Sequence, residues 1–206
     1  MTHTFLLVWA RMKPTRILPT LISSLALAAA VTTAKADAIF QFGGFAPDLQ
    51  LIDANSNVSG LRIDIVYGEN ANVTGVDLGV VNSTTGDFTG FGYAIGANLV
   101  EGNATGIQWS WLYSHTGGDF TGWQSGIVAR ASGAGSAGFQ SGWVNLVEKD
   151  FTGLQWGLVN HAESFKGLQL GFVNMAEHLD GLQIGLVNYA GNSDLYKILP
   201  IVNWHF

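Results

Sequence analysis

The chain of 206 residues can bury one sizeable core, but 12% charged against 48% apolar residues is unusually apolar for a water-soluble protein of this length. The 27 glycines and 4 prolines, with 12% aromatic residues, argue against a collagen-like or disordered chain and favour extended structure with many turns. The absence of cysteine excludes disulfide frameworks and thiolate metal sites. A soluble all-β domain remains the alternative to a membrane protein.

Residues 1–38 are expected to be a secretory signal peptide. The basic segment Met12-Lys13-Pro14-Thr15-Arg16 precedes an apolar run over 17–31, and two A-x-A cleavage signals follow between Ala34 and Ala38. An uncleaved transmembrane anchor is the alternative, but serines and a proline interrupt the apolar run. A further apolar patch lies upstream of Met12, which makes Met12 an alternative initiator.

Cleavage after Ala38 has a consequence for the charge of the mature domain, residues 39–206. It removes four of the 9 basic residues and one of the 15 acidic residues, which leaves 5 and 14 and a net charge of −9. A surface this acidic repels phosphate backbones, so no nucleic-acid partner is expected. Export places the domain at the cell outer membrane or the cell surface.

One unit recurs nine times in the mature domain, with a period of 14 to 16 residues. The cleanest copies are Gly153-Leu-Gln-Trp-Gly-Leu-Val-Asn160, Gly167-Leu-Gln-Leu-Gly-Phe-Val-Asn174 and Gly181-Leu-Gln-Ile-Gly-Leu-Val-Asn188. The starting glycines are Gly60, Gly75, Gly90, Gly106, Gly122, Gly138, Gly153, Gly167 and Gly181. Repetition at this length predicts a single repetitive domain, either a stacked array or a barrel.

Inside each unit, apolar residues alternate with small or polar ones, which is the pattern of a strand with two different faces. In the last unit, Leu182, Ile184 and Leu186 lie on one face and Gln183 and Gly185 on the other. The polar face supplies the candidate site residues, which are Arg62, Asp64, Asp77, Gln108, Gln124, Arg130, Gln140, Gln155, Gln169 and Gln183.

Three segments resemble a bacterial family of surface-repeat proteins built from GLQIGLVN-type units. They are Gly60-Leu-Arg-Ile-Asp-Ile-Val-Tyr-Gly68, Asn72-Val-Thr-Gly-Val-Asp-Leu-Gly-Val-Val-Asn82 and the ending Pro200-Ile-Val-Asn-Trp-His-Phe206. The resemblance covers about residues 46–206 and implies an exported surface protein; the family's function is undefined, so no chemistry is implied. The units from Gly90 to Arg130 depart from the pattern because they lack its Val-Asn ending.

The period fits a membrane-spanning strand of about 9–11 residues followed by a turn of about 4. We therefore expect an all-β fold, an antiparallel up-and-down membrane β-barrel of about 10–12 strands with one repeat per strand. The apolar face would meet the lipid bilayer, and the candidate residues would line a narrow lumen, with Arg62 and Asp64 paired. The last strand, ending at Phe206, resembles the signal that outer-membrane insertion machinery recognises.

A β-solenoid, with one coil of about 15 residues per repeat, is the alternative fold. It would explain why asparagines recur at one repeat position, because amides stack into ladders when strands are parallel and in register. These asparagines are Asn82, Asn145, Asn160, Asn174 and Asn188. In the solenoid, the glutamine face is expected on an outer surface.

No catalytic site, cofactor or metal is expected. The segment 133–138 fits the G-x-G-x-x-G fingerprint but is expected to be a turn between strands rather than part of a βαβ unit. Histidines 115, 161, 178 and 205 fall in separate units, and no G-x-S-x-G elbow accompanies them. The expected function is therefore a structural or narrow-pore, porin-like role without catalysis; a surface solenoid for binding or adhesion is the alternative, and no small-molecule ligand can be named.

Overall fold

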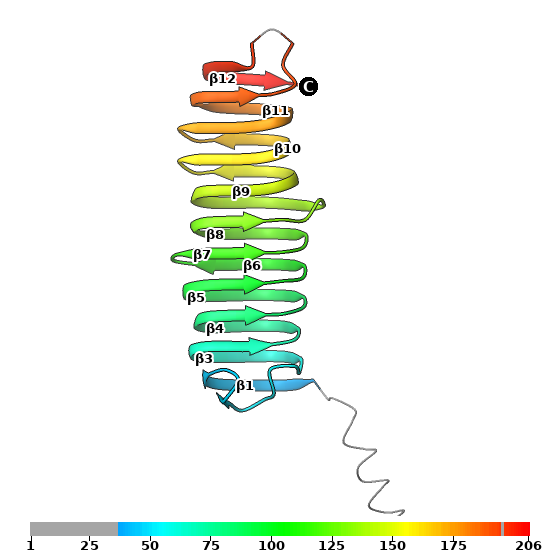
Figure 1. The fold of residues 1–206 in the computed structure, drawn as a ribbon, viewed down its shortest axis with the longest axis vertical. Coiled ribbons are helices and arrows are strands. Elements are labelled where there is room, and N and C mark those ends of the chain that lie inside the picture. The colour runs from blue at the N-terminus through cyan, green and yellow to red at the C-terminus, as the bar shows by residue number, and fades with distance from the viewer. Residues whose placement is uncertain (1–36, 195) are drawn as a thin grey trace, which may run out of the picture. The chain divides into compact units, whose positions relative to one another are not determined.

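The strands of the computed structural model belong to one sheet, in the order β12-β11-β10-β9-β8-β6-β5-β4-β3-β1-β2, with β7 beside β5 and β8 (Figure 1). The structure describes residues 37–194 and 196–206, which form one compact unit. The expected signal peptide, 1–38, lies outside the described residues except at its last two positions. Within the described part, no helix is long and apolar enough to span a membrane.

Strands β3 to β11 pair in parallel, and β1 pairs with β3 in the same way. The two ends differ, because β2 runs antiparallel to β1 and β12 runs antiparallel to β11. The bounds are β1 (Ala38–Phe45), β2 (Leu49–Gln50), β3 (Val58–Asn70), β4 (Val73–Thr84), β5 (Phe88–Val100), β6 (Ala104–Ser110), β7 (Tyr113–Thr116), β8 (Phe120–Ala131), β9 (Ser136–Trp156), β10 (Val159–Leu170), β11 (Val173–Ala190) and β12 (Ile198–His205).

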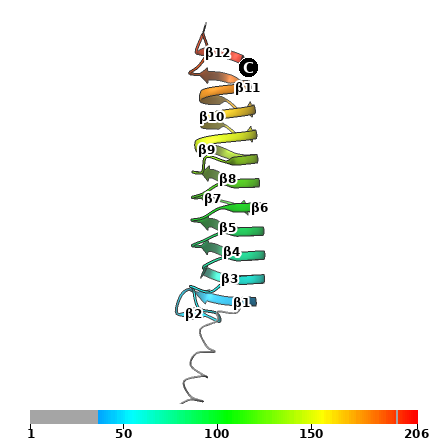
Figure 2. The same cartoon turned by 90° about the vertical axis from the view of Figure 1, so that its right-hand side faces the viewer.

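Each repeat forms one coil, and equivalent residues of successive coils lie side by side. Gly167 pairs with Gly181 and Gln169 with Gln183 in the register of β10 and β11. Figure 2 shows the coils stacked as a narrow column from β1 to β12. The fold of the described residues is therefore a parallel β-solenoid.

The expected antiparallel barrel is wrong, because a repeat is a coil with two strand segments rather than one strand plus a turn. The unit that starts at Gly106 shows this most clearly, since β6 ends at Ser110, the chain turns a corner, and β7 begins at Tyr113. Length and alternation are the same for both folds, so neither could separate them. The recurring asparagine was the feature that only the solenoid explains.

The porin-like narrow lumen is also wrong for the described residues, because side chains fill the interior of the coils. The six glutamines that were expected to line a lumen are at most 1% exposed. Their position also corrects the expectation that a solenoid would turn the glutamine face outward. Instead, Ile184 and Leu186 of the apolar face lie on the outside.

The starting glycines allow the coils to stack closely at one corner. All nine have φ angles between 118° and 151°. At Gly122, a Cβ would lie 1.9 Å from the carbonyl oxygen of Gly106 in the preceding coil. Only glycine adopts this conformation without strain and leaves room for the neighbouring backbone.

An apolar core lies between the two strand segments of each coil, away from the glutamines. Phe151 and Phe165 stack within it, with ring centroids 6.0 Å apart. Its buried members are Val58, Val73, Phe88, Val100, Ala104, Phe120, Ala131, Val147, Phe151, Ala162, Phe165, Ala176, Leu179 and Ala190.

Candidate functional site: an apolar groove over buried amide ladders

The interior beneath the candidate site contains a ladder of buried glutamines. Gln124 Nε2 donates to Gln108 Oε1 at 3.1 Å, and the same contact repeats in each coil up to Gln183 Nε2 and Gln169 Oε1 at 2.7 Å. Gln183 Nε2 also donates to the carbonyl oxygen of Tyr189 at 2.9 Å. The ladder makes burial of these amides tolerable, because the side-chain nitrogens from Gln124 to Gln183 each have a partner.

A second ladder of asparagines runs beside it with the opposite direction of donation. Asn145 Nδ2 donates to Asn160 Oδ1 at 2.7 Å, and Asn160 and Asn174 each donate to the next asparagine at 2.8 Å. Asn145 Nδ2 also donates to the carbonyl oxygen of Trp156 at 3.0 Å, close to the corner of the next coil. The asparagines therefore fix the corner on which the groove is built.

Charged residues replace the glutamines in the first two coils. Arg62 donates from Nε to Asp77 Oδ1 at 2.8 Å and from Nη2 to Asp77 Oδ2 at 2.6 Å. Arg62 Nε also lies 3.3 Å from Asp64 Oδ2. The pair expected between Arg62 and Asp64 is thus present, but the two-pronged partner is Asp77, since in-register stacking places it beside Arg62.

Burial sets the protonation of this cluster. Desolvation raises the pKa of Asp64 to about 6, although the Arg62 guanidinium opposes that rise, and the Asp77 carboxylate adds to it. The two acidic partners raise the pKa of Arg62 despite its burial. The cluster holds one permanent cation against two carboxylates, so Asp64 is the group that can take up a proton.

Arg130 is the candidate residue that the structure places elsewhere. It lies on the outside of the coil and pairs with Glu148. The corner at Gly126 and Ile127 is the reason, because two successive residues, Ile127 and Val128, face outward there. The alternation shifts by one position, so that Ala129 points inward instead of Arg130.

The histidines are not brought together. His115 stacks on Tyr113, with centroids 5.9 Å apart, and desolvation lowers the pKa of His115. His205 Nδ1 lies 3.0 Å from the carbonyl oxygen of Leu179, at the C-terminal end of the stack. Among the residues that the structure describes, no group of three His, Cys, Asp or Glu side chains is placed to hold a metal ion.

An open groove of about 1100 Å³ runs along the outer side of the corner, from Tyr93 to Ile201. Its floor is the backbone at the fifth residue of each coil, which is glycine in most copies. At Gly185, a Cβ would lie 2.1 Å from the carbonyl oxygen of Gly171, so the floor cannot carry side chains without displacing the stack.

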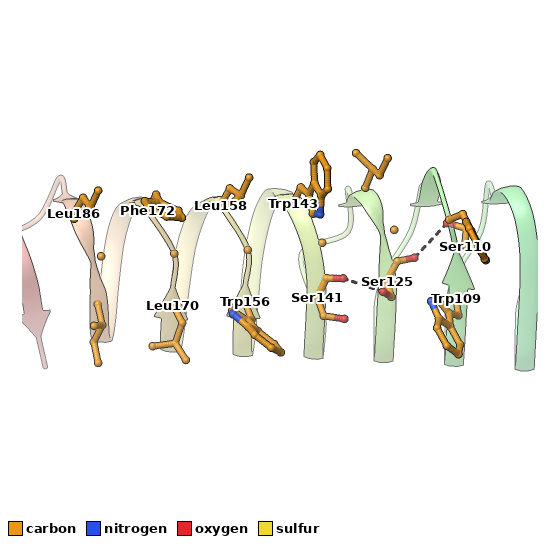
Figure 3. A pocket seen from close by; sticks show the side chains of 18 of the residues that line it. Trp109, Ser110, Ser125, Ser141, Trp143, Trp156, Leu158, Leu170, Phe172 and Leu186 are labelled. Carbon is orange, nitrogen blue, oxygen red and sulfur yellow. Dashed lines mark hydrogen bonds between the residues drawn. The ribbon is translucent and has the colours of Figure 1, made fainter.

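Two rows of apolar side chains form the walls of the groove and point away from each other (Figure 3). One wall contains Tyr93, Trp109, Trp156, Leu170 and Ile184, interrupted by Ser125 and Ser141. The other contains Trp111, Ile127, Trp143, Leu158, Phe172 and Leu186. The four tryptophans are 45–63% exposed, and none of the described residues that line the groove is charged.

Two serine hydroxyls and one indole N–H of the groove are already used inside the protein. Ser125 Oγ donates to the carbonyl oxygen of Ser141 at 2.9 Å, and Ser110 Oγ donates to that of Ser125 at 3.2 Å. Trp111 Nε1 donates to the Tyr93 hydroxyl at 3.0 Å. The groove therefore offers mainly apolar area, to which its other exposed tryptophans add indole N–H donors, and its chemistry is non-covalent binding of an apolar surface.

Sequence reasoning placed these apolar residues on an outer face but missed the groove. The signal that could have found it is the break in alternation after the glycine, where Leu158 and Val159 are two successive apolar residues before Asn160. A straight strand would place one of these two neighbours inside, whereas neither is buried and Asn160 is, so the chain turns there.

Comparisons with family models, with curated proteins and with solved structures found no match to this chain.

Proposed function

We propose that this chain is an exported surface module that binds an apolar partner along the groove. The observation that carries the proposal is the groove itself: two uncharged apolar rows that run from Tyr93 in β5 to Ile201 in β12 along the stack. Soluble monomers rarely expose contiguous apolar patches above about 300–600 Å², and larger ones mark interaction sites.

The rest of the coil supports a binding role because it holds the groove in one shape. The Asn ladder fixes the corner, and the glycine floor keeps the two rows apart. A preformed apolar site loses little conformational entropy when it binds. No catalytic group takes part in this proposal.

The N-terminal sequence supports display outside the cytoplasm. The basic segment, apolar run and A-x-A signals of residues 12–38 are typical of export. We therefore place the module at the outer membrane or cell surface, where a binding or adhesion role needs it. Fractionation of cells that express the full chain tests this placement.

Binding of the neutral fluorophore N-phenyl-1-naphthylamine tests the groove. We expect fluorescence enhancement with residues 37–206 in dilute solution, at nanomolar chain concentration, and a large loss of it in Trp156→Ser. The matched control is Trp204→Ser, because Trp204 is exposed to a similar degree, 58% against 62%, and does not line the groove. Equal binding by both variants and the parent chain would reject the groove as the site.

A further inference from the structure

We infer that the partner of the groove is a second copy of this chain. The two copies lie antiparallel, and a wall of each copy fits into the groove of the other. The inference rests on the proposed function and names its partner. Four observations carry it: the exposed area, the spacing of the rows, the distribution of side-chain size along them, and the placement of charge.

The exposed area is that of a stable dimer. The four groove tryptophans are 45–63% exposed, and with roughly 150–250 Å² per aromatic side chain they present about 350–600 Å². Leu158, Phe172, Leu186 and Ile201, at 44–69% exposure, add further apolar area. The total is about 800 Å², which is what each partner buries in a standard-size interface.

The spacing of the rows matches another solenoid. Equivalent side chains in this stack repeat once per hydrogen-bonded strand, at about 4.8 Å, whereas one face of a single strand repeats at about 6.8 Å. A helix presents one residue per turn of about 5.4 Å. A wall of a second copy therefore stays in step with this groove over its whole length.

Side-chain size favours the antiparallel orientation. The half of the groove nearer the N-terminus contains three of the four groove tryptophans, Trp109, Trp111 and Trp143, and the other half contains Trp156 with leucine, isoleucine and phenylalanine. A two-fold axis at the centre of the groove, between Trp143 and Leu158, places the bulky half of one copy on the aliphatic half of the other. Such an isologous contact is closed and stops at the dimer.

Charge placement permits this contact. Each coil leaves the groove at a residue such as Leu158 and returns to it at Leu170, so Glu163, midway between them, lies on the far side of the coil. The other acidic turn residues, including Glu148 and Glu177, take the same place. A groove-to-groove dimer keeps the acidic edges of its two copies apart. A site for an anionic membrane surface would carry basic residues, and none of the described residues that line the groove is basic.

Sedimentation velocity of residues 37–206 in detergent-free buffer tests the dimer. The parent chain should be dimeric at micromolar concentration, and Leu158→Lys should raise the dimer dissociation constant at least about 100-fold, because it places two like charges near the axis. Leu51→Lys is the control, since Leu51 is exposed outside the groove and this variant should remain dimeric. Circular dichroism confirms that both variants keep the β-fold.

Thiol cross-linking tests the orientation, because the chain contains no cysteine of its own. A mixture of Trp111→Cys and Leu186→Cys should give a cross-linked dimer with a short bis-maleimide, whereas each variant alone should give much less. Efficient cross-linking of each variant alone, with no gain in the mixture, would overturn the antiparallel arrangement.

The outcomes separate this inference from the proposed function. A monomeric parent chain that still binds N-phenyl-1-naphthylamine would overturn the dimer and leave the groove as a binding site. A monomer that co-sediments with phosphatidylcholine vesicles through the groove would replace the second copy by a lipid surface. A monomer that binds neither probe would remove both.

Discussion

One interior column of the solenoid, at the position of the stacked glutamines, contains different kinds of side chain in two parts of the molecule. From Gln108 to Gln183 it contains neutral amides, each bonded to the next coil. In the first two coils it contains Arg62 and Asp77, with Asp64 two residues further along. One part is a ladder of repeated amide bonds, and the other is an ion cluster that lies between Gln41 of β1 and Gly92 of β5.

The difference shows what an in-register stack demands of its interior. Identical amides can stack because each has a donor and an acceptor, whereas identical charges would repel, so a charged column must alternate in sign. Gly92, which carries no polar side chain, lies between the ion cluster and the glutamine ladder. There Gln108 Nε2, the end of the ladder, has no hydrogen-bond partner within the described residues.

Removing the cation of the cluster should have the largest effect on stability. Arg62→Met leaves two buried carboxylates without their partner, and loss of one member of a buried pair costs about 3–5 kcal/mol. Urea unfolding of residues 37–206 at neutral pH measures this loss in the free energy of unfolding. A cost below about 1 kcal/mol would mean that the cluster is not buried and paired as described.

Breaking the amide ladder in its middle should cost less than that, but more than breaking it at its end. Gln155→Leu removes a residue bonded to glutamines on both sides and should cost about 2–4 kcal/mol. Gln183→Leu removes one ladder bond, because Gln183 Oε1 has no hydrogen-bond partner in the described part of the chain, and should cost about 1–2 kcal/mol. Equal costs in urea unfolding would contradict a continuous ladder.

The ion cluster should make stability depend on pH in a way that the ladder does not. Asp64 has its pKa raised from 3.8 to about 6 on folding, so the folded state binds more protons in that window and stability falls as pH rises through it. The shift corresponds to about 3 kcal/mol.

Asp64→Asn should abolish this slope. The difference in unfolding free energy between the variant and the parent chain should therefore change in favour of the variant between about pH 4 and pH 7 and level off above. A difference that stays constant across the window would show that Asp64 does not titrate in this way. Gln155→Leu serves as the control without a titrating group.

The smallest expected effect is a gain in stability from extending the asparagine ladder. Ala129 occupies the asparagine position in its coil, and Asn145 Oδ1 in the next coil has no hydrogen-bond partner among the residues that the structure describes. Ala129→Asn should supply a donor and stabilise by about 0.5–1.5 kcal/mol. Ala162→Asn, at a buried alanine of the apolar core, should destabilise instead.

Much of the residue pattern could be predicted from the sequence, but the direction of the strands could not. Alternation separated Leu182 and Ile184 from Gln183 correctly, since it depends only on neighbouring residues. Parallel pairing depends on contacts between residues 14 to 16 apart, and the same period accommodates a strand and a turn. The recurrence of Asn145, Asn160 and Asn174 was the local sign of stacking.

The position of the site could not be predicted from the sequence because alternation does not show where the coils turn. Arg130 was misplaced because alternation was extended through Gly126, where the chain turns and two consecutive residues face outward. The same corners create the groove. Alternation along a straight strand therefore predicts the apolar residues of its walls but not the groove between them. The partnership of Arg62 with Asp77 was missed for a related reason, because Asp77 is in the next coil.

The central claim is that each repeat forms one coil of the stack. Distances between spin labels along one column test it most directly. One label is placed at Thr74 and the other at Thr105, Thr121, Thr152 or Lys166, which are exposed equivalent positions two, three, five and six coils away. Each is introduced as cysteine in this cysteine-free chain and measured with an excess of unlabelled chain. The solenoid predicts distances that rise steadily, by about 4.8 Å per coil. Distances that alternate between short and long along the series would show antiparallel strands and contradict the stack.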